Sequence, residues 1–286
     1  MVVHWRPLEA GELSASGTEQ DQNANTPFGA LAPTALQRVL IALGRRSVLK
    51  RGLFRTRFAN LIMALRPGPL DIDFRHCGYR IRCEDNLIEC GLLLNPAYNG
   101  DDIDFLISGA SSDANFVDIG SNIGLYSLPM AKSAPEGKTI AIDPNPLMAQ
   151  RLAFNAAGSG LGNVTIVPVA ISDTNRQGAL KIRLDDVAIV ALEESTDGDV
   201  PIRTLVDVLA EHEVTTIYGL KIDIEGHEDQ ALVPFLSNAP TALLPQRVVI
   251  EHSRGTDYPG CLAELQRLGY QLYGRSRNNS FYLRSE

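Results

Sequence analysis

The stretch that decides the fold is residues 116–127, "FVDIGSNIGLYS". Its first residues form a short apolar run that is typical of a buried strand, with Asp118 near the strand end. Gly120 and Gly124 follow, and glycines let a backbone turn tightly and approach a ligand closely. In an open parallel sheet, ligands bind beyond the carboxyl ends of the strands, where the strand order reverses. We therefore interpret the stretch as a strand that leads into a ligand-binding loop.

Strand-like and helix-like segments alternate along the chain on both sides of this point. Strict alternation predicts an α/β fold, with a mostly parallel sheet and helices on both faces. A Tyr- and Phe-rich pair of segments near the end predicts a terminal hairpin with one antiparallel strand. The predicted strands are 116–119, 139–142, 165–168, 217–222 and 248–251, the helices lie near 123–134, 146–157, 204–213 and 228–237, and the hairpin lies near 270–274 and 280–284.

The chain before residue 111 differs in character. Residues 1–33 are rich in small polar residues without apolar periodicity, which predicts a disordered tail. Residues 34–110 predict short helices and a hairpin near 70–83, which together would form a cap. We therefore expect the α/β domain itself to occupy residues 111–286.

Composition is typical of a globular protein in water: of 286 residues, 44% are hydrophobic and 21% are charged. No apolar run reaches the length that spans a bilayer, and the N-terminus does not resemble a signal peptide. Four cysteines in so long a chain do not suggest a disulfide framework. We therefore expect a cytoplasmic protein.

Charge is distributed unevenly around a net value of −8. Residues 34–66 contain eight Lys or Arg and no acid, so the rest of the chain is strongly acidic. Two interpretations stay open for this segment. It could be a helical cap whose apolar residues cover the catalytic domain, or it could contact an acidic glycan or the inner face of a membrane. No basic, aromatic-rich platform supports a nucleic-acid partner.

The spacing of acid and glycines favours one kind of ligand. The dinucleotide fingerprint G-x-G-x-x-G presents helix N–H groups to a pyrophosphate, whereas this chain has D-x-G-x-x-x-G. A carboxylate at Asp118 repels a pyrophosphate and suits a cationic amine. The second predicted strand leads to Asp143, whose carboxylate can accept hydrogen bonds from ribose hydroxyls. An amine, a ribose and no phosphate describe S-adenosylmethionine, although both acids could instead merely cap helices.

Five motifs in order resemble the FkbM family of S-adenosylmethionine-dependent methyltransferases. They are the opening stretch, "IDPNP" (142–146), "VAISD" (169–173), "PIRTLVDVL" (201–209) and "GLKIDIEGHEDQAL" (219–232). The resemblance implies the class I methyltransferase fold, which is Rossmann-like with seven strands, and O-methylation of sugars and natural products. It also implies cofactor contacts, with Asp118, Gly120, Ser121, Asn122 and Gly124 along the methionine part, Asp143 and Pro144 at the ribose, and Asp173 at the adenine edge.

Two departures from the family pattern concern this cofactor region. The family usually has Glu where this chain has Asp143, and the shorter side chain calls for a bridging water or a shift of the loop. Pro129 lies inside the first predicted helix of the domain. Because proline breaks a helix interior, that helix is either kinked or starts later than the glycines suggest.

Charges at the end of the fourth predicted strand give the candidates for catalysis. Lys221, Asp223 and Glu225 share one face of a strand that should be apolar, and such charges need partners or a wet cleft. Lys221 could simply pair with an acid. Methyl transfer to a hydroxyl needs a group that takes its proton, and Glu225 and His227 are the candidates. Asp223 would orient them or hold the cofactor, while His227 could equally be a helix-start residue without a chemical role.

Several functional alternatives remain at this point. Asp223 or Glu225 with Glu251 could hold a divalent ion, but no third oxygen ligand is evident, so a metal is not favoured. An NAD-dependent oxidoreductase, a nucleic-acid methyltransferase and a non-catalytic glycan- or membrane-binding protein are the rival functions. The favoured interpretation is an O-methyltransferase acting on a sugar, glycan, glycolipid or secondary metabolite. The acceptor pocket would be built from inserts such as 174–200 and the N-terminal region.

Overall fold

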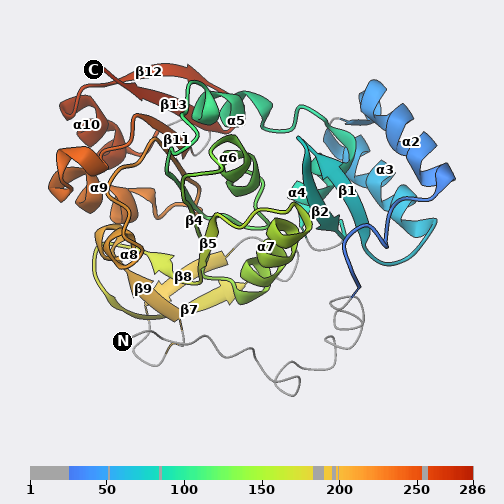
Figure 1. Cartoon of the computed structure of the whole chain (residues 1–286), viewed down its shortest axis with the longest axis horizontal. Coiled ribbons are helices and arrows are strands. Elements are labelled where there is room, and N and C mark those ends of the chain that lie inside the picture. The colour runs from blue at the N-terminus through green and yellow to red at the C-terminus, as the bar shows by residue number, and fades with distance from the viewer. Residues whose placement is uncertain are drawn as a thin grey trace.

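The computed structural model describes residues 26–50, 52–83, 86–182, 190–194, 198, 200–252 and 257–285. A central sheet crosses the molecule and carries helices on both faces, and a smaller helix-and-hairpin unit lies at one end (Figure 1). Within the described ranges, no helix is both long and apolar enough to cross a membrane.

The central sheet has seven strands in the order β12-β13-β11-β10-β3-β4-β5. Within this sheet β13 runs antiparallel to both of its neighbours, and the other adjacent strands pair in parallel. The strand order reverses between β3 and β10, which is the class I methyltransferase arrangement that the sequence predicted. The strands are β3 (Phe116–Ile119), β4 (Thr139–Ile142), β5 (Val164–Val167), β10 (Gly219–Ile222), β11 (Arg247–Glu251), β12 (Tyr270–Arg275) and β13 (Asn279–Arg284).

Alternate strand residues feed two separate apolar cores. Phe116 and Val249 point into the core formed with α5 (Gly100–Ile107), α6 (Ser127–Ser133) and α7 (Pro146–Gly158). Val117 and Val248 point into the core formed with α8 (Leu205–Glu211), α9 (Glu228–Asn238) and α10 (Pro259–Arg267). Because each fully buried large apolar side chain contributes roughly 1.5–3 kcal/mol, these two layers hold the sheet and fix the strand ends that form the site.

The N-terminal extension (residues 26–94) packs beside α7. Its hairpin strand β2 contacts α7, and its buried residues, Ile62 and Leu93 among them, belong to the same apolar core as α5–α7. The predicted division at residue 110 stays a prediction, and the structure places α5 against β10 and β11. The elements of the extension are α2 (Ala35–Arg46), η1 (Val48–Lys50), α3 (Gly52–Ala64), β1 (Leu70–Phe74), β2 (Cys77–Ile81) and α4 (Leu87–Leu94).

The predicted disordered tail is wrong for residues 26–33, while residues 1–25 lie outside the described residues. The backbone N–H groups of Gly29 and Leu31 donate to Asp71 Oδ2 at 2.8 Å and 3.1 Å. Asp71 is buried and also pairs with Arg80, whose Nε lies 2.7 Å from Asp71 Oδ1. The buried Asp71 carboxylate needs hydrogen-bond donors, and the backbone of residues 29–31 supplies two of them.

The apolar residues of the basic segment fall into two sets: Ile41, Ile62 and Met63 are buried in the same core as α5–α7, and others are exposed. The buried residues of α2 are Gln37, Ile41 and Gly44, whereas Leu36, Val39 and Leu43 are exposed. Gln37 Nε2 donates to the Ile62 carbonyl at 3.0 Å, and Gly44 admits side chains of α3 and α4. The small and amide residues therefore form the helix contact, because they allow close approach and a buried hydrogen bond.

A second sheet, which the sequence did not predict, forms within residues 170–203. It contains β6 (Ala170–Ile171), β7 (Arg176–Ile182), β8 (Val190–Glu194) and β9 (Val200–Arg203) in the order β6-β9-β7-β8. β7, β8 and β9 lie together near the lower edge of the molecule in the view of Figure 1.

Candidate active site

The glycine loop (residues 120–124) lies over the carboxyl end of β4. The N–H groups of Gly120 and Ser121 both donate to the Ile142 carbonyl, at 2.9 Å and 3.1 Å. Gly120 has φ +79°, and a Cβ there would lie 1.9 Å from the Asp223 carbonyl oxygen. Only glycine permits this approach, so the loop lies directly against the residues that follow β10.

Asp143 holds the loop from the neighbouring strand end. Its Oδ2 accepts from the Asn122 N–H at 2.7 Å, and its Oδ1 accepts from the Asn145 N–H at 2.9 Å. Burial raises the pKa of Asp143 to about 6, because the charged form loses hydration. Each carboxylate oxygen has a second lone pair, so Asp143 retains the capacity to accept from a ligand hydroxyl.

The first helix of the domain starts late, as one of the two sequence alternatives required. Residues 122–126 form turns, and α6 begins at Ser127. Pro129 therefore lies in the first helical turn, where a missing N–H removes no intrahelical hydrogen bond.

Lys221 is the buried centre of a charge cluster on one face of the sheet. Its Nζ lies 3.9 Å from Asp118 Oδ1 and 3.4 Å from Asp223 Oδ2, and it donates to the Gly120 carbonyl at 3.2 Å. Burial lowers the pKa of Lys221, but the carboxylates of Asp223 and Asp118 raise it above its usual value overall. Lys221 therefore pairs with acids, as one interpretation of the sequence proposed, and it joins the glycine loop to Asp223.

Asp118 is enclosed within this cluster. Its side chain is fully buried, and Oδ2 accepts a hydrogen bond from Ser127 Oγ at the start of α6. Burial raises the pKa of Asp118, and the charge of Lys221 opposes that rise. The direct contact of Asp118 with a methionine amine stays a prediction, and in this structure its carboxylate acts on the loop through Lys221.

The three candidate catalytic residues follow β10 in a tight loop. Asp223 is half-buried, Glu225 is exposed with φ +55°, and His227 is the N-cap residue of α9 without a side-chain capping bond. Sequence analysis missed Glu228, whose two carboxylate oxygens accept from the N–H groups of Ile224 and Gly226 at 2.9 Å. Glu228 closes the loop, and an acid in the first turn of the following helix was the available signal.

Comparison with known proteins identifies the family. The Methyltransferase FkbM domain model matches residues 118–272, which is more than half of the chain. The chain belongs to the FkbM methyltransferase family. Methyltransferase sdnD of Sordaria araneosa is 29% identical to this FkbM protein over 163 residues, which cover 44% of this chain and 62% of that relative.

Solved structures resemble this FkbM chain at low identity. A precorrin-6y C5,15-methyltransferase from Geobacter metallireducens has a TM-score of 0.43 and 13% identity, with 67% of this chain and 89% of that chain covered. A SAM-dependent O-methyltransferase from Thermotoga maritima has a TM-score of 0.41 and 13% identity, with 65% of each chain covered.

Glu251, at the end of β11, adds an acid to the FkbM site. Burial and then the nearby Asp223 carboxylate raise the pKa of Glu251 to about 9, so Glu251 is protonated at neutral pH. In the described part of the chain, no group of three or more His, Cys, Asp or Glu side chains is arranged to hold a metal ion. Protonation lowers the repulsion among acids that meet at this edge of the sheet.

Asp173, the residue predicted at the adenine edge, contacts residues of its own segment. It follows β6, and its side chain is 49% exposed and accepts from Arg176 at 2.8 Å. The Arg176 hydrogen bond lowers the pKa of Asp173. The fold therefore brings together the FkbM motif residues after β3, β4 and β10, and it leaves Asp173 on the second sheet.

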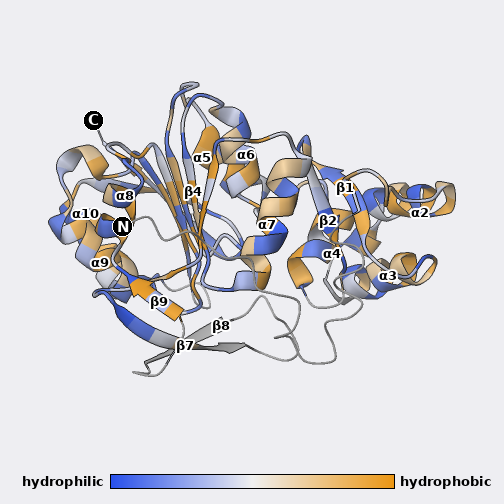
Figure 2. Cartoon of the chain, turned by 60° about the horizontal axis from the view of Figure 1, so that its bottom comes forward, coloured by the Kyte–Doolittle hydropathy of each residue, from blue (hydrophilic) through white to orange (hydrophobic). Residues whose placement is uncertain are grey.

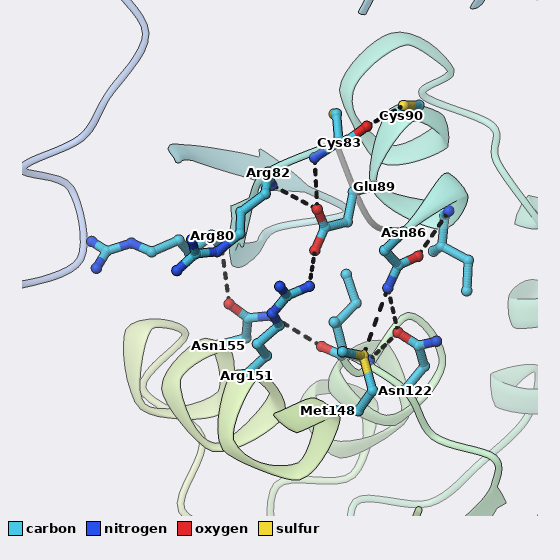
Figure 3. Close-up of polar contacts among 12 residues, drawn as sticks. Arg80, Arg82, Cys83, Asn86, Glu89, Cys90, Asn122, Met148, Arg151 and Asn155 are labelled. Carbon is cyan, nitrogen blue, oxygen red and sulfur yellow. Dashed lines mark hydrogen bonds and ion pairs between the residues drawn. The ribbon is translucent and has the colours of Figure 1, made fainter. Parts of the chain in front are cut away.

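The N-terminal extension binds the glycine loop through buried polar groups that sequence analysis missed. Asn86 Nδ2 donates to Asn122 Oδ1 at 2.8 Å, and Tyr79 OH donates to the Gly124 carbonyl at 3.1 Å. Asn155 of α7 accepts from the Arg80 N–H at 2.9 Å and donates to the Ile123 carbonyl at 3.0 Å. Figure 3 shows how Asn86, Asn122 and Asn155 connect these segments.

Glu89 strengthens the same junction. Its Oε2 accepts from the N–H groups of Arg82 and Cys83 at 2.6 Å and 2.9 Å, and its Oε1 lies 3.4 Å from Arg151 of α7 (Figure 3). Glu89 is fully buried, so these partners offset the cost of removing its charge from water. The extension is thus bound to the FkbM glycine loop and to α7 by buried polar contacts.

Two buried polar atoms near the glycine loop fit a bound S-adenosylmethionine. Ser121 Oγ and Asp118 Oδ1 have no hydrogen-bond partner among the described residues, and both side chains are at most 2% exposed. Buried polar groups are normally satisfied, so a ligand or water is the expected partner. A hydroxyl and a carboxylate together suit an ammonium and carboxylate, which is the amino-acid end of this cofactor.

Proposed function

We propose that the protein transfers a methyl group from S-adenosylmethionine to a hydroxyl of a sugar, glycan, glycolipid or secondary metabolite. The observation that carries the proposal is the contact between Gly120 and the loop after β10. The Asp223 N–H donates to the Ile119 carbonyl at 3.0 Å, immediately before the glycine loop. The candidate proton acceptors after β10 and the proposed cofactor loop after β3 therefore lie together, at the point where the strand order reverses.

The proposed cofactor residues have distinct tasks. Asp118, Gly120, Ser121, Asn122 and Gly124 hold the methionine part, and Asp143 accepts from the ribose, with Pro144 beside it. Asp118 and Lys221 fix the loop electrostatically, and Asp173 remains the proposed adenine-edge residue. When bound, S-adenosylmethionine supplies a methyl group on a positively charged sulfur, which is already activated for transfer.

The proposed acceptor site uses the residues after β10. The acceptor hydroxyl has to lose its proton, and Glu225 is the proposed base because it is exposed beside the glycine loop. His227 is the alternative base, two residues farther along the chain. Asp223 is held by Lys221 at 3.4 Å and so is placed to orient the acceptor or cofactor rather than to take the proton.

Family membership argues against the NAD-dependent alternative and against a non-catalytic role. An acidic chain with net charge −8 disfavours a nucleic-acid acceptor, because phosphate backbones bind basic surfaces. Small-molecule or glycan acceptors therefore remain the proposed class. The cytoplasmic location stays a prediction, and a required divalent metal is not part of the proposal.

A labelled-methyl transfer assay tests this function. The full chain is incubated with S-adenosylmethionine labelled in the methyl group and with sugar, glycolipid and metabolite fractions, and mass spectrometry locates the label. Glu225→Gln is expected to lower kcat by about 10²–10⁴-fold while S-adenosylmethionine affinity is retained. The matched control is Glu213→Gln, because Glu213 also has a positive φ, +56°, and lies outside the site.

The outcomes separate the parts of the proposal. Label on nitrogen or carbon alone would contradict O-methylation. Wild-type turnover by Glu225→Gln, with a large loss in His227→Asn, would move the base to His227. Equal loss in Glu225→Gln and in the Glu213→Gln control would show that the loss is not specific to the site.

A further inference from the structure

We propose that α2, η1 and α3 form a docking surface for an anionic lipid bilayer. This inference is independent of the proposed reaction, because it concerns the helices at the end of the molecule distant from the seven-stranded sheet (Figure 1). It rests on two observations: the helices expose apolar side chains, and their charged residues are all basic.

Exposed apolar side chains concentrate on these helices. Of the ten large hydrophobic residues that are exposed in the described chain, seven lie between residues 36 and 65. Scattered single hydrophobic residues are normal on a surface, but a cluster marks an interaction site. The seven are Leu36, Val39, Leu43, Val48, Phe54, Leu61 and Leu65, with exposed fractions between 44% and 72%.

The exposed residues form one stripe on each helix. On α2, Leu36, Val39 and Leu43 are three and four residues apart, so they lie on one side of the helix. On α3, Phe54 and Leu61 are seven residues apart and also share a side. Figure 2 shows hydrophobic segments on both helices at this end of the molecule.

The stripes lie away from the rest of the extension. α2 contacts α4 through other residues, since Arg45 Nε donates to the Leu93 carbonyl at 3.0 Å and Gly44 meets Leu94. α3 turns Arg55 toward Tyr98, with 5.2 Å between the guanidinium and the ring centre. Both helices therefore pack through other residues, and their apolar stripes remain exposed.

The charged residues within the segment that carries the stripes have a single sign. Residues 34–66 contain eight Lys or Arg and no Asp or Glu. Arg45, Arg55 and Arg66 contact the protein itself, whereas Arg38, Arg46 and Arg57 are exposed. Exposed leucines beside exposed arginines are the pattern of helices that lie in a bilayer interface, with the arginines at anionic headgroups.

This pattern favours a bilayer over other occupants. A second copy joined through the same surface would bring two basic segments together, and like charges repel. A nucleic acid would match the charge but not the aliphatic side chains, because single-stranded binders rely on aromatic stacking and Phe54 is the sole aromatic residue among the seven. An anionic bilayer satisfies both the apolar stripes and the arginines.

Vesicle co-sedimentation of the full chain tests the proposal. Vesicles of phosphatidylcholine with an equal part of phosphatidylglycerol are compared with vesicles of phosphatidylcholine alone. Wild type is expected to bind the anionic vesicles at least about tenfold more tightly, and added salt is expected to reduce this preference. Leu36→Ser with Leu43→Ser is expected to weaken binding by about tenfold or more per leucine.

Two further variants make the test specific. Arg46→Gln with Arg57→Gln is expected to abolish most of the preference for anionic vesicles and to leave binding to neutral vesicles unchanged. Leu272→Ser is the matched control, because Leu272 is 50% exposed on β12 and is expected to have no effect. Circular dichroism verifies that each variant is folded, and calorimetry with S-adenosylmethionine verifies that the reaction site is unchanged.

Several results would overturn the docking surface. They are absence of binding to either vesicle, equal weakening by Leu272→Ser, or wild-type binding by the Leu36→Ser, Leu43→Ser variant. Self-association in sedimentation velocity that the leucine variant removes, or tight binding of a homopolymeric RNA that the arginine variant removes, would replace the bilayer with that partner. None of these results bears on methyl transfer, which the separate labelled-methyl assay measures.

Discussion

Asn86, in the N-terminal extension, donates a hydrogen bond to the side-chain oxygen of Asn122, in the glycine loop, across 2.8 Å. The two residues are 36 positions apart in the chain, and both are buried. Asn122 also has φ +48°, a conformation that non-glycine residues rarely adopt. The extension thus supports the backbone conformation on which the proposed cofactor contacts depend.

Replacing Asn86 should weaken cofactor binding. Asn86 Oδ1 also accepts from the Ile88 N–H at 3.0 Å and so caps α4. Asn86→Ser keeps a capping oxygen and loses the reach to Asn122, whereas Asn86→Ala loses both. We expect both variants to bind S-adenosylmethionine more weakly in calorimetry, and Asn86→Ala alone to lose about 1–2 kcal/mol more stability in thermal or denaturant unfolding. Unchanged affinity in both variants would show that the contact does not position the loop.

Gly120→Ala should be severely destabilising for two reasons that a control can separate. The added Cβ would lie 1.9 Å from the Asp223 carbonyl oxygen, and φ is +79°. Gly160 has φ +68°, and a Cβ added there would have no atom within 4 Å, so Gly160→Ala reports the backbone cost alone, about 1 kcal/mol. We expect Gly120→Ala to lose at least about 2 kcal/mol more than Gly160→Ala in denaturant unfolding. Equal losses would contradict the close contact between loop and strand end.

Asp143 should make stability depend on pH between about 4 and 6. Its folded pKa, about 6, is above its ordinary value of 3.8, so the folded state holds the proton more tightly than the unfolded state. The contribution to stability is therefore full below pH 4 and is lost as pH rises to 6, with a size of roughly 3 kcal/mol. Denaturant unfolding of wild type and Asp143→Asn measures the difference, and parallel pH profiles for the two proteins would refute this role.

Glu251 should make stability fall at higher pH. Its folded pKa, about 9, exceeds the ordinary value of 4.5, so the stabilisation is present below pH 4.5 and is lost as pH rises toward 9. Glu251→Gln is neutral at every pH and keeps a donor toward Asp223. We expect Glu251→Gln to become more stable relative to wild type as pH rises. The difference in the free energy of unfolding should grow by at most about 1.4 kcal/mol per pH unit. A constant difference between pH 6 and pH 9 would show that Glu251 is ionised throughout.

The sequence predicted the five parallel strands of the central sheet because each is a short, mostly apolar run next to polar or turn-forming residues. Asp118, Gly120 and Asp143 were identifiable because their meaning depends on local spacing and on strand ends. Pro129 was informative for the same reason, since proline restricts its own helix. Local features of this kind can be predicted from a single sequence.

Contacts between residues distant in the chain could not be predicted from the sequence. Tyr79, Asn86 and Glu89 bind the loop and α7 from a distant segment, and no local pattern distinguishes them from surface polar residues. The helical spacing of Leu36 and Leu43 predicted an amphipathic helix correctly, but it did not say which side packs. Gly44 decided that question, because close approach to α3 and α4 needs a residue without a side chain.

The most direct test of the proposed cofactor site is calorimetric titration of the folded full chain with S-adenosylmethionine. The residues around Gly120, Asp143 and Lys221 predict one-to-one binding, with similar or tighter binding of the demethylated product and no competition by NADH. Asp143→Ala should bind at least about tenfold more weakly, because it loses a ribose partner and the hold on the Asn122 N–H. Absence of heat with both the cofactor and its product, from wild-type protein whose fold is verified by circular dichroism, would contradict the proposed site.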